Sequence, residues 1–372
     1  MMKAIPVNEP LLGGNEKKYL NQCIDTGWIS SEGPFVRQFE AEFARRVDRK
    51  FGIAVNNGTA ALEAAIVSLG LEPGDEVIMP AFTIISCASA ITRAGATPVL
   101  VDSDPSTWNM RVDQIADRIT SRTRAIMVVH IYGLPVDMDP VLTLAKKHGL
   151  LVIEDAAEMH GGTYHGKPCG SFGNISIFSF YPNKHVTTGE GGMILTDSEV
   201  LADRCRSYSN LCFQPKRRFV HEELGWNYRM SNIQAAVGVA QLERLDEFIS
   251  RKKAMGKLYQ QLLANVPEIQ LPLESSEGNE NIYWVFGLVI RDAAKLDAAE
   301  VMRRLAERKI QTRPFFWPMH EQPALKKMGL FEGESYPVAE NLARQGLYVP
   351  SGLALTDEQL ITVARAVREV VQ

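Results

Sequence analysis

Four short apolar runs, separated by helical patterns, are the feature that most restricts the fold of this chain. We predict buried strands at residues 76–80, 97–102, 125–130 and 150–155. A helical stretch from Asp139 to His148 leads into the last of them and ends at Gly149. Strands that are apolar on both faces and alternate with helices form a mainly parallel sheet covered on both sides. In such sheets, ligands bind beyond the carboxyl ends of the strands.

The pattern changes near Ser231, which indicates a second domain. With 372 residues, the chain is too long for one small domain. A long helical pattern covers residues 232–251, and it is followed by a strand candidate at 283–290 and helices at 298–308 and 357–371. We therefore expect a large domain over residues 1–245 and a smaller α/β domain over 246–372, with a polar loop at 272–281.

The composition of the chain restricts the cellular compartment and the kinds of partner that we expect. The formal net charge is −4, so no overall basic field attracts nucleic acid or an anionic membrane. The five scattered cysteines are odd in number and lack metal-site spacing, which predicts free thiols in a reducing compartment. The chain shows no signal peptide and no apolar run of the roughly 20 residues that span a bilayer. We expect a cytoplasmic protein that binds neither nucleic acid nor membrane.

The stretch from Phe178 to Gly192 carries the strongest chemical signal, because it sets a lysine among small and hydroxyl-bearing residues. Lys184 lies there between strand candidates at 175–180 and 193–196. A lysine that forms a Schiff base needs a desolvated pocket that lowers its pKa, and neighbours small enough to admit a cofactor. The alternative is a glycine-rich turn with one exposed lysine, and this segment alone does not exclude it.

Two further segments suggest the rest of a pyridoxal-phosphate (PLP) site. Asp155 ends a predicted strand, where side chains point into the ligand crevice. The pyridine nitrogen of PLP needs an acidic partner to stay protonated, which makes the ring an electron sink. A helix cap or an edge salt bridge is the alternative role for Asp155. Gly58 and Thr59 open an alanine-rich helix whose amides and dipole suit a phosphate, although many capped helices look similar.

Taken together, these stretches resemble the sugar aminotransferases of the DegT/DnrJ/EryC/StrS group, which are fold-type I PLP enzymes. Ordered matches cover essentially the whole chain, at residues 28–33, 57–59, 154–158, 183–184, 187–192, 225–230 and 312–314. The resemblance implies an α/β fold, with a mixed, mostly parallel sheet flanked by helices in a large domain and a smaller C-terminal α/β domain. It also implies PLP as the cofactor, with pyridoxamine 5'-phosphate as the intermediate.

The resemblance further implies roles for individual residues. Lys184 and Asp155 are the expected catalytic residues: Lys184 would bind PLP covalently and move a proton, and Asp155 would pair with the pyridinium nitrogen. Cofactor binding is expected at Gly58, Thr59, Asp155, Glu158, Ser179, Lys184 and Asn227. Glu158 would approach the ring hydroxyl, and Gly58, Thr59 and Ser179 would hold the phosphate.

Part of the site is expected to come from a second subunit. The resemblance implies that Asn227 reaches the phosphate of the partner, and therefore that the enzyme is a homodimer with shared active sites. Residues Trp28, Ser30, Arg313 and His320 would face the nucleotide-sugar. No metal ligand is expected.

Within the group, the segments at 101–104, 130–133 and 318–320 resemble the branch that forms GDP-perosamine. That branch aminates GDP-4-keto-6-deoxymannose with L-glutamate, for bacterial surface polysaccharide such as O-antigen. Recognition of guanine follows from the resemblance alone. Three positions depart from the pattern: Ile84 replaces an aromatic residue that stacks on the PLP ring, Pro182 replaces a glycine, and residues 209–213 replace a glycine-containing segment.

Three alternatives remain at this stage. The carrier could be UDP or dTDP, because the PLP motifs carry no information about the base. A PLP-dependent sugar dehydratase has the same fold, but that branch has histidine where this chain has Lys184. A non-catalytic regulator that binds PLP or a nucleotide-sugar is disfavoured by the intact set of Lys184, Asp155 and Ser179.

Overall fold

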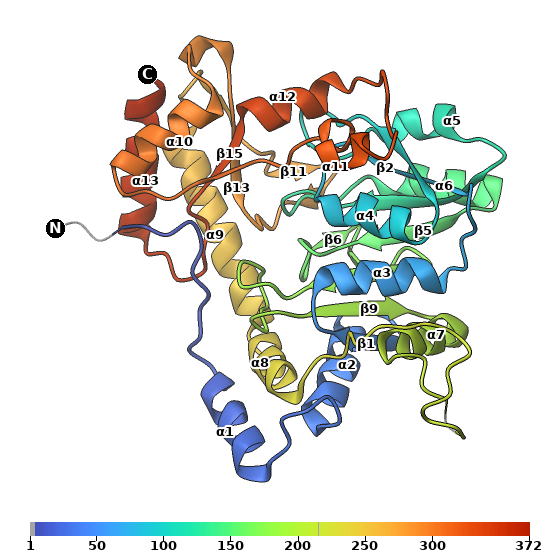
Figure 1. The fold of residues 1–372 in the computed structure, drawn as a ribbon. Coiled ribbons are helices and arrows are strands. Elements are labelled where there is room, and N and C mark those ends of the chain that lie inside the picture. The colour runs from blue at the N-terminus through green and yellow to red at the C-terminus, as the bar shows by residue number, and fades with distance from the viewer. Residues whose placement is uncertain (1–3, 215) are drawn as a thin grey trace.

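The computed structural model describes residues 4–214 and 216–372, and its larger part is built on a seven-stranded sheet (Figure 1). The strand order is β1-β9-β8-β5-β4-β2-β3. The strands are β1 (Phe51–Val55), β2 (Glu76–Pro80), β3 (Thr97–Val101), β4 (Thr123–Val129), β5 (Leu151–Asp155), β8 (Ile175–Ser179) and β9 (Gly192–Thr196). The pairings from β3 to β8 are parallel, and β9 runs antiparallel to both of its neighbours. The predicted mostly parallel sheet is confirmed.

Both faces of this sheet are buried. Successive residues of a strand point to opposite faces, so Val77 and Met79 of β2 enter one hydrophobic core while Ile78 enters the other. The first core is covered by α3 (Gly58–Ser68), α4 (Ile85–Arg93) and α7 (Glu199–Ser209). The second is covered by α2 (Pro34–Arg46), α6 (Met138–His148) and α8 (Asn232–Leu242). This double cover explains why the strand sequences show no polar alternation.

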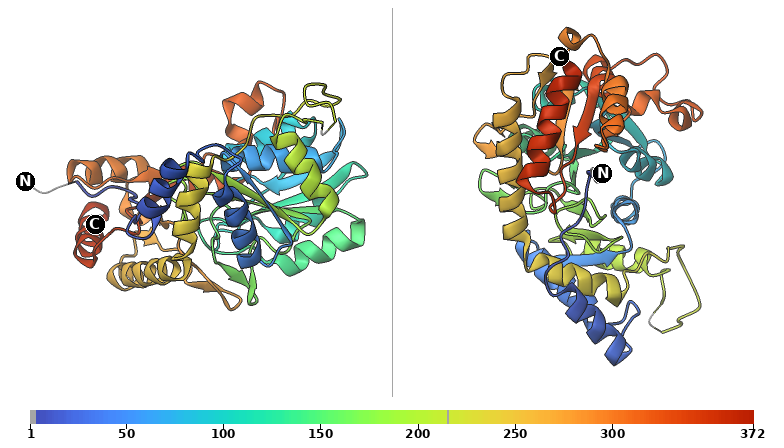
Figure 2. Two further views of the ribbon diagram at one scale, coloured as in Figure 1. Left: turned by 90° about the horizontal axis from the view of Figure 1, so that it is seen from below. Right: turned by 90° about the vertical axis from the view of Figure 1, so that its left-hand side faces the viewer.

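The smaller part contains a four-stranded antiparallel sheet of β10 (Ile269–Gln270), β13 (Phe286–Ile290), β15 (Gly346–Val349) and β14 (Arg313–Pro314). A third hydrophobic core lies between this sheet and three helices, α9 (Leu245–Leu263), α10 (Ala298–Glu307) and α13 (Asp357–Val371). Helix α12 (Pro337–Gln345) packs against the first core. In the right-hand view of Figure 2, these elements lie at the opposite end from α1 (Glu16–Thr26). Ile5 pairs with Ile310 and joins the third core. The division at 245/246 stays our proposal.

Two predicted elements are corrected. The helix expected at 232–251 is two helices, because Glu243 and Arg244 form a turn that interrupts it. The break lets α9 leave the large sheet and run along the small one (Figure 1). The loop expected at 272–281 contains a hairpin of β11 (Ser275–Ser276) and β12 (Asn279–Glu280). Its two turn residues, Glu277 and Gly278, both have left-handed backbone, as tight hairpin turns require.

The remaining elements are short. They are α5 (Ile115–Arg118), α11 (Pro323–Lys326), β6 (Thr163–Tyr164), β7 (Lys167–Pro168) and 3₁₀ turns at Val112–Gln114, Asp292–Ala294 and Met319–Glu321. All five cysteines are free, and all are buried. Across residues 4–214 and 216–372, no helix combines the length and the apolar character needed to cross a membrane.

Lys252 on α9 gives a prediction about stability. Its buried amine donates to the backbone carbonyls of Trp284 and Ser351, and burial lowers its pKa to about 7. An unfolded lysine titrates near 10.4, so the unfolded chain binds more protons between these values and stability should rise with pH there. Relative to Lys252→Met, the unfolding free energy of the wild type should gain up to about 1.4 kcal/mol per pH unit. Urea titrations across this range measure the gain, and a constant difference would contradict it.

Candidate active site

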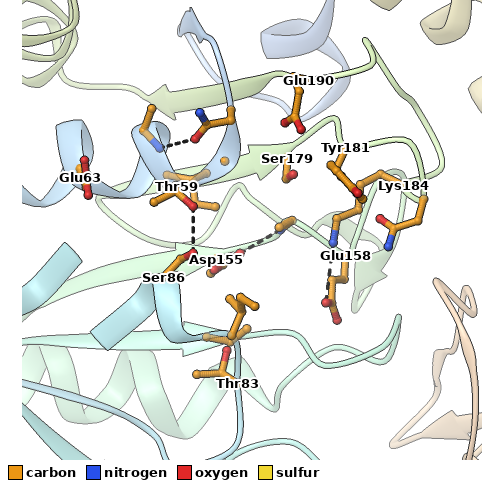
Figure 3. Close-up of a pocket in the computed structure, with 18 of the residues that line it drawn as sticks. Thr59, Glu63, Thr83, Ser86, Asp155, Glu158, Ser179, Tyr181, Lys184 and Glu190 are labelled. Carbon is orange, nitrogen blue, oxygen red and sulfur yellow. Dashed lines mark hydrogen bonds and ion pairs between the residues drawn. The ribbon is translucent and has the colours of Figure 1, made fainter. Parts of the chain in front are cut away.

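A cavity of about 710 Å³ opens at the carboxyl ends of β4, β5 and β8 (Figure 3). The large sheet, the start of α3 and the loop after β8 form most of its wall, and the small part adds the aromatic residues Trp284, Phe316 and Tyr348. This is the edge at which a parallel sheet is expected to bind its ligand. Both parts of the chain therefore contribute to one pocket.

Lys184 lines this cavity, and little of its side chain is exposed. Its side chain is 9% exposed, and its Nζ lies 3.7 Å from Glu158 Oε1 and 3.7 Å from the centre of the Trp284 ring. Figure 3 shows Lys184 and Glu158 facing each other. Burial lowers the pKa of the Lys184 amine, and the charges of Glu158 and Asp155 oppose that shift. The alternative of an exposed lysine on a flexible turn is wrong.

Glu158 is the nearest carboxylate to this amine. Its Oε2 accepts the backbone N–H of Tyr132 at 2.7 Å. Burial raises the pKa of Glu158 to about 7, against the lowering effect of the Lys184 charge. Glu158 can therefore gain or lose a proton near neutral pH, next to an amine whose own pKa is lowered by burial.

Asp155 lies at the end of β5 with both carboxylate oxygens held. Oδ1 accepts the N–H of Ala157 at 3.0 Å, and Oδ2 accepts the thiol of Cys87 at 3.3 Å. Burial raises the pKa of the Asp155 carboxyl. Since neither hydrogen-bond partner is charged, a protonated ring nitrogen would supply the positive charge that favours the ionised carboxylate. A carboxylate held in this way fits the protonated ring nitrogen of PLP as its acceptor.

The start of α3 forms a cradle that fits a phosphate. Asn57 caps the helix by accepting the N–H of Ala60 at 2.8 Å. First-turn amides have no intrahelical acceptor, and the positive end of the helix dipole attracts an anion. The hydroxyls of Thr59 and Ser86 lie 2.8 Å apart in the cavity wall (Figure 3). The buried amine, the buried carboxylate and this helix start together fit PLP.

Gly58 is packed so closely that a side chain would disturb the cradle. A Cβ there would lie 2.8 Å from the Cβ of Ser179. Forcing such a contact costs about 1–3 kcal/mol, so we expect Gly58→Ala to weaken PLP binding about tenfold or more. Absorbance titration of the apoprotein with PLP measures this. Gly13→Ala, whose Cβ would meet only Arg244 Nη1 at 3.4 Å, is the control. Unchanged PLP affinity in Gly58→Ala would contradict the phosphate assignment.

Several residues expected at the site lie elsewhere in this chain. None of Trp28, Ser30, Asn227, Arg313 and His320 lines the described cavity. The first four are exposed. His320 is buried, with Nε2 3.0 Å from Glu340 Oε1. Their predicted contacts with substrate or with the partner's cofactor stay predictions.

The structure adds residues that the sequence analysis did not assign. The Trp284 indole covers Lys184 and donates to the carbonyl of Asn183 at 2.8 Å. Cys87 holds Asp155, and buried Glu63 accepts from Arg93 and Tyr228 in another part of the wall. In the sequence, Trp284 lies within the strand candidate at 283–290 and looks like a core aromatic. Ile84, at the position where an aromatic residue is usual, does line the cavity.

Comparison with known proteins agrees with this geometry. The model of the DegT/DnrJ/EryC1/StrS aminotransferase family matches residues 10–368. GDP-perosamine synthases of Escherichia coli O157:H7 and Caulobacter vibrioides are each 42% identical to this chain, over 99% and 98% of both lengths respectively.

Solved structures give the same result for the fold and the cofactor. The aminotransferase TlmJ from Streptoalloteichus hindustanus superposes with a TM-score of 0.91 at 30% identity, over 99% of this chain and 98% of that one. The PLP form of Streptococcus pneumoniae Spr1654 superposes with a TM-score of 0.91 at 25% identity, over the same shares. The predicted fold class and the predicted PLP cofactor are confirmed. The chain belongs to the DegT/DnrJ/EryC1/StrS aminotransferase family and is a PLP-dependent aminotransferase.

Proposed function

We propose that the enzyme transfers the amino group of L-glutamate to GDP-4-keto-6-deoxymannose and so forms GDP-perosamine. The main support is the 42% identity, over nearly the full length, to two relatives named GDP-perosamine synthase. The cavity supplies the amine, the carboxylate and the phosphate cradle that a PLP-dependent transamination requires. The product would serve surface polysaccharide such as O-antigen, and five free thiols suit a cytoplasmic enzyme.

We further propose a homodimer with shared active sites. Asn227, Trp28 and Ser30 are exposed and lie off the cavity of their own chain, as residues that serve a partner's site would. The segment between α7 and α8 also exposes large apolar side chains, with Phe219 80% and Leu224 89% exposed. Residues 216–224 project away from the sheet in Figure 1. Exposed apolar groups of this size favour an interface between proteins.

The residues of the cavity divide the chemical work. When bound, PLP supplies an electron sink that acidifies the proton on the reacting carbon of the amino donor. Lys184 Nζ would take that proton from the donor carbon and deliver it to the cofactor, because burial leaves more of its amine unprotonated near neutral pH. Asp155 stays anionic to hold the proton of the ring nitrogen. The first turn of α3, with Ser179, would hold the phosphate and so fix the position of the ring in the cavity.

Glu158 and Trp284 control the catalytic amine between proton transfers. Glu158 attracts the charged amine from one side, and the Trp284 ring stabilises a cation on the other. The ring also excludes water from the amine, which keeps the pKa of the amine low. Since Trp284 comes from the small part of the chain, the pocket is complete only when both parts are folded together.

Absorbance spectroscopy of the purified protein tests the proposal in two steps. The PLP absorbance band should bleach when L-glutamate is added, and it should return when GDP-4-keto-6-deoxymannose follows. UDP- and dTDP-linked 4-keto-6-deoxy sugars serve as matched comparisons. If a UDP- or dTDP-linked sugar restores the band and the GDP-linked sugar does not, the GDP assignment is wrong while the aminotransferase assignment stands. If glutamate never bleaches the band, the proposed donor is wrong.

A further inference from the structure

Asp155 is held by a residue from a different element, and that residue has no role in the proposed function so far. Cys87 lies in the first turn of α4, and its Sγ is 3.3 Å from Asp155 Oδ2. The other oxygen of Asp155 accepts the backbone N–H of Ala157. The orientation of the carboxylate therefore depends on two donors, of which only Cys87 is a side chain.

The Cys87 sulfur acts as a hydrogen-bond donor in this contact. Its side chain is fully buried. Burial raises the pKa of the thiol well above its ordinary value, and the charge of Asp155 raises it further. The thiol therefore keeps its proton at neutral pH, and that proton can only be shared with an acceptor. Asp155 Oδ2, at 3.3 Å, is the nearer acceptor, and as a carboxylate it has no proton of its own to donate.

A third group extends this contact to the wall of the cavity. The hydroxyl of Thr83 lies 3.6 Å from Cys87 Sγ, and Thr83 lines the cavity beside Ile84. Thr83, Cys87 and Asp155 thus form a buried line of polar groups that joins the start of α4 to the end of β5. A shift of α4 would move the donor and, with it, the carboxylate.

We propose that Cys87 is a positioning residue that aims the Asp155 carboxylate at the ring nitrogen of PLP. The proposal rests on the role proposed above for Asp155. A thiol is a weak donor, so it fixes the direction of the carboxylate while withdrawing little of its negative charge. That charge remains available to hold the proton of the ring nitrogen.

The test is to reconstitute the holoenzyme with PLP labelled with ¹⁵N in the ring and to follow the nitrogen shift against pH by NMR. In Cys87→Ala, the pKa of the ring nitrogen should fall by about one unit or more, and PLP affinity should fall about tenfold, as expected for a lost hydrogen bond to a charged group. Cys87→Ser retains a donor and should restore the PLP affinity to within about threefold of the wild type and the ring-nitrogen pKa to within about half a unit. Neither readout requires turnover or a sugar substrate.

Cys205 provides a matched control. It is also fully buried, lies in the same hydrophobic core, and has its Sγ 3.2 Å from the hydroxyl of Ser68. Neither Cys205 nor Ser68 lines the cavity. Cys205→Ala should leave both the ring nitrogen and the PLP affinity unchanged. If Cys87→Ala does not fold, Cys87→Val removes the donor with less loss of volume and replaces it in the test.

The outcomes separate the two assignments. If Cys87→Ala or Cys87→Val binds PLP as tightly as the wild type, with the same ring-nitrogen pKa, Cys87 only packs and the proposal is wrong. If the ring nitrogen of the wild type is unprotonated at neutral pH, the role of Asp155 fails, and this proposal fails with it. Neither result bears on whether the sugar is carried by GDP.

Discussion

Lys184→Ala is expected to lower kcat by at least about 10⁴-fold while the protein keeps its fold. The variant loses both the covalent attachment of the cofactor and the base that moves the substrate proton. The fold should survive because the side chain borders a cavity, and truncation there removes no part of a hydrophobic core. Burial of Glu158 beside the missing amine is tolerated, since its raised pKa of about 7 lets it become neutral. Steady-state kinetics measure the loss of kcat, and circular dichroism measures whether the fold is kept.

Two further variants make the result specific. Lys184→Arg keeps a cation between Glu158 and Trp284, but a guanidinium does not give up its proton in proteins, so this variant should be as inactive as Lys184→Ala. Lys253→Ala removes an exposed lysine on α9 that pairs with Glu280, and it should leave kcat unchanged. If Lys184→Ala keeps more than about a hundredth of the wild-type kcat, Lys184 is not the catalytic lysine.

The sequence was sufficient for the large sheet and for the centre of the site. Strands such as β4 and β5 are apolar on both faces, and that pattern has few solutions other than a parallel sheet between helix layers. Asp155 could be assigned because it is the last residue of such a strand, at the edge of the sheet where this fold binds its ligands. Lys184 could be assigned only together with the segments of Asp155 and Gly58–Thr59, because its own small and hydroxyl-bearing neighbours did not exclude a glycine-rich surface turn.

The contacts across long separations could not be predicted in this way. Trp284 lies 100 residues after Lys184, and Cys87 lies 68 residues before Asp155. The periodicity of apolar residues predicts that such residues are buried. It does not distinguish a residue that packs in the core from one that contacts a catalytic group. The break between α8 and α9 was missed for a related reason, because the apolar spacing continues through Arg244 although the helix does not.

Asp155→Asn is expected to lower kcat about 10²-fold and to weaken PLP binding about tenfold. The amide has the shape of the carboxylate and can still accept the N–H of Ala157, so the cofactor should keep its place. A neutral amide cannot hold the proton of the ring nitrogen, however, and the ring then withdraws fewer electrons from the reacting carbon. Stopped-flow absorbance with L-glutamate should show a slower bleaching of the PLP band.

A second buried aspartate separates this effect from a general loss of stability. Asp102 accepts the backbone N–H groups of Val338 and Ala339 at the start of α12 and does not line the cavity. Asp102→Asn should therefore lower the melting temperature without slowing the bleaching, whereas Asp155→Asn should do the reverse. A rate for Asp155→Asn within about threefold of the wild type would mean that the enzyme does not depend on a protonated ring. The electron sink would then come from the aromatic system alone, and Cys87 would have nothing to position.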